Sequence, residues 1–101
     1  MESDWLREVS RFVTIGLFYP GWFLRKPLLG IVEQDQAGHY FVSNEALGLY
    51  AVGFTRDEAL EEFKTTIIDN YQLLEARAGE DLDLKILFWE YQNYLERAAI
   101  P

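Results

Sequence analysis

Residues 53–60 read Gly-Phe-Thr-Arg-Asp-Glu-Ala-Leu, and this stretch holds the clearest local signal in the chain. The Thr55 hydroxyl can accept a hydrogen bond from the backbone N–H of Glu58. The Glu58 carboxylate can accept one from the N–H of Thr55 in return. This capping box predicts that a helix begins directly after Thr55. Gly53 suits the tight exit of a strand just before it.

The helix predicted over residues 55–78 is amphipathic. Its apolar side chains recur every three or four residues and therefore share one face. They are Ala59, Leu60, Phe63, Ile67, Tyr71, Leu74 and Ala78. Glu61 and Glu62 fall on the outer face, and Gly79 is the expected stop.

Upstream of this helix, residues 28–33, 39–43 and 47–52 have the composition of short strands. Brief polar connections separate them, which predicts an antiparallel meander. Both faces of this sheet are apolar in sequence. The helix covers one face, and the other needs cover from the last helix, the N-terminus or another chain.

The N-terminal residues 1–24 fit two patterns. Trp5, Leu6, Val9, Phe12 and Val13 have roughly helical spacing. Residues 12–18 are equally typical of a strand, because they are rich in Val, Ile and Phe. The sequence leaves both alternatives open.

A second helix is predicted over residues 82–98. Its main apolar face consists of Leu84, Leu87, Phe88, Tyr91, Tyr94, Leu95 and Ala98. Leu82, Ile86 and Trp89 lie on the opposite side at 100° per residue. A surface helix of a monomer needs only one apolar face, so these three residues are a candidate interface and predict a homodimer. Contact with the N-terminal segment is the alternative.

The composition limits the function. The chain has 101 residues, one domain's length, so residues 1–101 are expected to form a single domain. Its net charge of −8 disfavours direct nucleic-acid binding and favours a basic protein partner. There is no cysteine, secretory pattern or long apolar span, which predicts a cytoplasmic protein without membrane contact.

No set of residues assembles a reaction centre. His39 is the single histidine, and a contact with Glu33 or Asp35 across the hairpin is the chemistry open to it. The sequence therefore predicts no catalytic residue, no metal ligand and no cofactor. We expect a protein-binding module. The alternatives are a homo-oligomeric structural protein and a small enzyme or ligand binder with an apolar pocket.

Residues 25–78 resemble the N-terminal domain of HicB-type antitoxins. The most specific part is the pattern G-x-T-x-x-E-A-L, formed by Gly53, Thr55, Glu58, Ala59 and Leu60. The resemblance implies an α+β fold like a truncated ribonuclease H fold without its catalytic carboxylates. It would have a three- or four-stranded antiparallel sheet with a helix packed on one face, followed here by the C-terminal helix. It also implies that the protein neutralises a small basic HicA-like ribonuclease toxin by covering it.

The chain departs from that family in two places. It has no basic recognition helix, so an operator-binding segment is not expected. It also has no strand pattern at residues 80–84, where the family places a fourth strand, and residues 12–18 are the alternative source of one.

Overall fold

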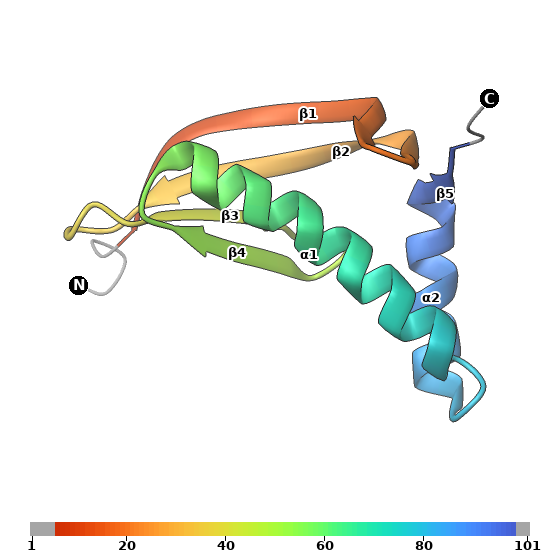
Figure 1. The fold of residues 1–101 in the computed structure, drawn as a ribbon. Helices are drawn as coiled ribbons and strands as arrows, with labels where there is room; N and C mark the ends of the chain where they lie inside the picture. The colour runs from red at the N-terminus through yellow and green to blue at the C-terminus, as the bar shows by residue number, and fades with distance from the viewer. Residues whose placement is uncertain (1–5, 99–101) are drawn as a thin grey trace.

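The computed structural model describes residues 6–98, which form an α+β fold, as predicted. The elements in chain order are β1 (Arg7–Tyr19), β2 (Trp22–Gln34), β3 (Tyr40–Asn44), β4 (Leu49–Gly53), α1 (Arg56–Arg77), α2 (Leu82–Tyr94) and β5 (Leu95–Arg97). The strands form one antiparallel sheet in the order β1-β2-β3-β4, and β5 pairs with β2. α1 lies across one face of this sheet (Figure 1).

The N-terminal ambiguity is resolved in favour of a strand. β1 pairs with β2 along nearly its whole length, because two 13-residue strands connect through a tight turn at Gly21, whose φ is +84°. The Phe12 ring packs against Gly30, where an added Cβ would overlap the ring. Trp5, part of the helical alternative, lies outside the described residues.

The polar connection between the strands predicted over residues 28–33 and 39–43 forms a hairpin loop, but the strand predicted over residues 47–52 begins later than expected. Residues 45–48 form a turn, so β4 starts at Leu49 and not at residue 47. Gly48 takes a φ of +63° there. The buried Asn44 side chain holds the turn, because it donates to the Leu29 carbonyl and accepts from the Leu47 N–H.

The capping box is present at the start of α1. The N–H of Glu58 donates to the Thr55 hydroxyl over 3.1 Å, and the N–H of Thr55 donates to the Glu58 carboxylate over 3.3 Å. Gly53 lets this helix end approach β4, since a Cβ on it would stand 2.9 Å from the Ala59 Cα. Ala59 is fully buried, whereas Leu60 is only partly buried at the margin of the core.

α1 is much longer than β3 and β4, the two short strands of the sheet. Its 22 residues span about 33 Å, against about 17 Å for the five-residue β3 and β4. Its second half therefore extends past β3 and β4 (Figure 1) and forms a second part of the core with the start of β2 and with α2. There the Tyr71 ring packs edge-on against Trp22 at 5.0 Å and Phe88 at 5.2 Å.

The C-terminal helix is shorter than predicted. The 82–98 expectation is wrong beyond Tyr94, because residues Leu95–Arg97 leave the helix and pair with Trp22–Leu24. Arg25 fixes this change of direction by donating to the carbonyls of Gln92 and Leu95. Leu95 is fully buried. Within residues 6–98, neither helix is both long and apolar enough to cross a membrane.

Candidate protein-binding surfaces

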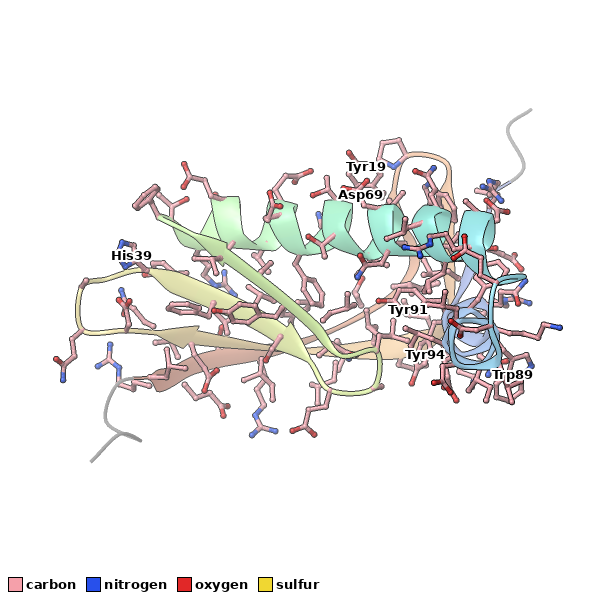
Figure 2. All side chains as sticks on the ribbon, turned by 90° about the horizontal axis from the view of Figure 1, so that it is seen from below. Tyr19, His39, Asp69, Trp89, Tyr91 and Tyr94 are labelled. Carbon is pink, nitrogen blue, oxygen red and sulfur yellow. The ribbon has the colours of Figure 1, made fainter. Side chains whose placement is uncertain are left out.

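The sheet has one covered face and one open face. Figure 2 shows α1 on one side, with side chains of the sheet projecting on the other side, where no described element lies. The register places apolar side chains of all four strands on this open sheet face. Its members are Val13, Ile15, Leu17, Leu29, Ile31, Phe41, Tyr50 and Val52. Leu17 is 70% exposed and Val13 63%. The predicted need for cover on this face is not met by α2 or by the N-terminal strand.

A narrow groove runs between β1 and α1. Its volume is about 200 Å³. The lining is Phe12, Thr14, Phe18, Leu60, Phe63 and Ile67, with Arg56 and Lys64 at its rim. Phe12 meets Phe63 edge-on at 6.0 Å across its floor, and Arg56 donates to the Ser10 hydroxyl of β1 at 3.3 Å. We call this the β1 groove.

A wider hollow lies on the other side of α1, beside the outer edge of β4. Its volume is about 630 Å³, and it is widely open to solvent. Apolar walls come from Phe41, Val52 and Phe54, and acidic ones from Glu58, Glu61 and Glu62, with His39, Gly53 and Thr65 completing the lining. Phe54 is 76% exposed, the largest value among the exposed apolar residues of the described chain. We call this the β4 hollow.

The two flanks of α1 therefore carry opposite charge. The helical spacing puts Glu58, Glu61 and Glu62 beside β4 and puts Arg56 and Lys64 beside β1. Within the described residues, neither Arg56 nor Lys64 has a carboxylate oxygen within 4 Å, whereas several other arginines are paired on the surface. The helix thus separates an acidic side of the molecule from a basic one.

His39 makes one of the two carboxylate contacts that were open to it, and the partner is Asp35. Its Nδ1 lies 3.0 Å from Asp35 Oδ2, and its backbone N–H donates to Asp35 Oδ1 over 2.8 Å. Partial burial raises the pKa of Asp35, but the hydrogen bonds from His39 outweigh it and leave the pKa below its usual value. Both contacts close the β2–β3 loop, and among residues 6–98 no cluster of three potential ligands could hold a metal ion.

Leu82, Ile86 and Trp89 lie where the helical spacing predicts, on the outer side of α2. Their exposed fractions are 68%, 52% and 58%. All three are therefore exposed to solvent within residues 6–98. Trp89 lies at the end of the molecule opposite His39 (Figure 2).

The opposite side of α2 belongs to the core. Tyr91 is buried there, accepts a hydrogen bond from Asn70 at 3.1 Å and donates to the Leu47 carbonyl at 3.4 Å. Burial raises the pKa of its phenol, and the Asn70 hydrogen bond offsets part of that effect. The hydroxyl therefore has a structural role between α1, α2 and the β3–β4 turn.

The motif residues Gly53, Thr55, Glu58, Ala59 and Leu60 come together at the start of α1. Four of them build the strand exit and the helix cap, and Leu60 lines the β1 groove. Sequence reasoning missed Phe54, which belongs to neither the alternation of β4 nor the apolar face of α1. That mismatch was the signal that could have identified it as a surface residue.

Comparisons with models of known protein families, with curated proteins and with solved structures find no match to this chain.

Proposed function

We propose that this chain is a protein-binding module of the antitoxin type, whose partner is a small basic protein that docks at the β4 hollow. The observation that carries the proposal is that the β4 hollow combines an exposed aromatic side chain with carboxylates that form no ion pair within the described residues. Phe54 supplies the apolar contact, and Glu61 and Glu62 supply the charge.

The chemistry of the β4 hollow suits a lysine or arginine side chain. The aliphatic stem of such a side chain packs along an apolar wall while its charged head reaches a carboxylate. Phe54 and Val52 at the edge of β4 offer that wall, and Glu61 and Glu62 line the hollow from α1. An aromatic ring adds attraction for the cation itself.

The backbone of β4 offers a second mode of contact. β4 is an edge strand of the sheet, so its outer N–H and C=O groups are open to an added strand. A partner strand placed there would project alternate side chains toward the β4 hollow. Main-chain hydrogen bonds would then supply affinity, and the acidic wall would select basic side chains.

The resemblance to HicB-type antitoxins supports the same partner class. It implies a HicA-like ribonuclease, a protein built to bind phosphates and therefore basic on its working surface. The net charge of −8 would attract such a protein over a distance. The proposal places the protein in the cytoplasm, as the cysteine-free composition suggests.

The experiment is co-expression of the chain with each small basic protein encoded beside it. One neighbour should be toxic alone, tolerated with this chain, and co-purified with it. Glu61→Lys combined with Glu62→Lys should abolish protection and co-purification. The control is Glu45→Lys with Asp83→Lys, which makes the same charge change at exposed sites away from the hollow. A control pair that disrupts binding as strongly would show that net charge, and not this site, recruits the partner.

A second candidate function is a homo-oligomeric structural protein without a toxin. The exposed apolar surface of β1 and of the open sheet face favours it. A pull-down that returns only this chain, with no toxic neighbour, would select this candidate.

A further inference from the structure

The β1 groove combines an apolar interior with a basic mouth. Among its lining residues, Phe18 and Phe63 are buried, with exposed fractions of 9% and 2%. Arg56 and Lys64 stand at its rim on α1. A positive charge beside apolar, poorly hydrated surface attracts a negative group more strongly than it does in bulk water. The groove therefore favours an anion, although the chain as a whole carries a net charge of −8.

We propose that the β1 groove binds a small aromatic carboxylate. The ring lies between β1 and α1, and the carboxylate lies at the rim beside Arg56 and Lys64. This site is separate from the one that would receive a basic protein, because the β4 hollow is on the other flank of α1.

The volume of the groove sets the size of the ligand. An apolar cavity of about 150 Å³ is enough for one benzene molecule. The β1 groove measures about 200 Å³, which leaves room for one ring and a short substituent. Drug-sized ligands occupy pockets of about 300–1,000 Å³, so they are too large for this groove.

The lining favours an aromatic ring over an aliphatic one. Phe12 and Phe63 already meet edge-on, with ring centroids 6.0 Å apart. Aromatic pairs gain energy in this arrangement beyond what the burial of their surface provides. A ligand ring placed between these side chains and Phe18 can present an edge or a face to each of them. A saturated ring of the same shape lacks that contribution.

The two cations can serve a single carboxylate. Arg56 and Lys64 are about two turns apart on α1, with Leu60 midway between them on the same side of the helix. Helical side chains lean toward the N-terminus of their helix, which directs Lys64 back over Leu60. Lys64 is half-buried and forms no ion pair within the described residues. Arg56 donates one hydrogen bond to the Ser10 hydroxyl, and the guanidinium retains further donors for an anion.

The first test is an NMR titration of the full chain with phenylacetate, followed through the backbone amide signals. We expect saturable shifts around Thr14 of β1 and Phe63 of α1, with a dissociation constant of about 1 mM or lower. Acetate lacks the ring and phenylacetamide lacks the charge, so each should bind at least about 10-fold more weakly. Cyclohexylacetate should also bind more weakly, because its ring is not aromatic.

Three results of this titration would overturn the proposal. One is the absence of saturable shifts at about 10 mM phenylacetate, a concentration that would fill even a millimolar site. Another is binding of phenylacetamide as tight as that of phenylacetate, since the cations would then select nothing. The third is equal or tighter binding of cyclohexylacetate, which would remove the reason for an aromatic ligand.

The second test compares variants that separate charge from volume. Lys64→Gln should weaken phenylacetate binding by about 10-fold, because a charge-assisted hydrogen bond becomes a neutral one. Lys85→Gln is the matched control, since it makes the same charge change at an exposed site on α2 and should alter binding by less than about twofold. Thr14→Phe should abolish binding by filling the groove while it leaves every charge in place. Circular dichroism would establish that each variant folds.

Equal weakening by Lys64→Gln and Lys85→Gln would mean that net charge alone attracts the ligand, and unchanged binding in Thr14→Phe would place the ligand elsewhere. Either result would refute the site. The proposal does not depend on a basic protein partner. The Glu61→Lys, Glu62→Lys protein should still bind phenylacetate even where it no longer binds that partner, because both glutamates line the β4 hollow.

Discussion

Gly53→Ala is the substitution that most directly tests how α1 is attached to the sheet. A Cβ at this position would stand 2.9 Å from the Cα of Ala59 and 2.9 Å from the carbonyl carbon of Glu58, with the Ala59 nitrogen closer still. Ordinary contacts of a Cβ lie at 3.4–4 Å. All three atoms are backbone of the first turn of α1, so no flexible side chain can move aside.

The cost follows from that geometry. The whole helix start must move outward by several tenths of an ångström, and Ala59, which is fully buried, moves with it. Overpacking of this kind costs about 2–3 kcal/mol. For a domain of this size, that lowers the midpoint of thermal unfolding by roughly 10–20 °C.

The assay is thermal or urea unfolding followed by circular dichroism, with Gly79→Ala as the matched control. Gly79 has no atom within 4 Å of its added Cβ and no positive φ, so the same methyl group should be neutral or stabilising there by up to about 1 kcal/mol. If Gly53→Ala unfolds at the wild-type temperature, α1 does not approach β4 this closely, and the structural reason for Gly53 in the motif is wrong.

Three further outcomes follow from single contacts. Thr55→Ala should lower the free energy of unfolding by about 1 kcal/mol, because the N–H of Glu58 loses its acceptor; unchanged urea melts would contradict the cap. The hydrogen bond from Arg97 holds the pKa of Glu75 below its usual 4.5. This pair therefore stabilises the fold above pH 4.5, and the benefit is lost as the pH falls through the lowered pKa. Glu75→Gln should remove that part of the acid sensitivity, which NMR titration and pH-dependent melts would measure. Trp89→Glu should dissociate a homodimer held by Leu82, Ile86 and Trp89, because the exposed Trp89 side chain would lose its apolar contact. A sedimentation coefficient that stays that of a dimer would place the interface elsewhere.

The positions of the two helices could be predicted from the sequence, because the residues that define a helix lie within the helix itself or directly beside it. The capping box needs only residues 55–58, and the apolar face of α1 repeats within one element. Phe63, Ile67, Tyr71 and Leu74 are buried as the spacing predicts, with Ile68 as an additional member of the core. Such patterns are independent of what the helix packs against.

The strand boundaries depended on distant partners and were less predictable. Val9, Phe12 and Val13 fit a helical face as well as a strand, and only pairing with residues 29–32 decides between them. Leu95 continues the apolar face of α2 in sequence. It nevertheless leaves the helix, because Trp22–Leu24 offers a strand and the Arg25 guanidinium holds the Leu95 carbonyl. Neither Trp22–Leu24 nor Arg25 lies within residues 82–98, so the sequence of that segment alone does not predict where the helix ends.

The candidate surfaces also differ in how far the sequence predicts them, depending on whether one element or several elements form them. Leu82, Ile86 and Trp89 were found from their position on one helix. The β4 hollow was not, because it combines residues of β3, β4 and α1 that adjoin only in the folded chain. In sequence, Glu61 and Glu62 are typical solvent-facing acids of a helix. Only the fold brings Phe54 and Val52 into the same hollow with them.

The two edges of the sheet differ in charge, and this difference follows from the charges on α1. The acidic flank of the helix adjoins β4, whereas Arg56 and Lys64 adjoin β1. A basic strand added at β4 meets complementary charge, whereas the same strand at β1 would meet the like charges of Arg56 and Lys64. Because the edges lie on opposite sides of the sheet (Figure 1), a basic partner should select β4 over β1. Each chain should therefore bind one basic partner, at its β4 hollow. Titration calorimetry giving two partners per chain would refute this selection between the edges.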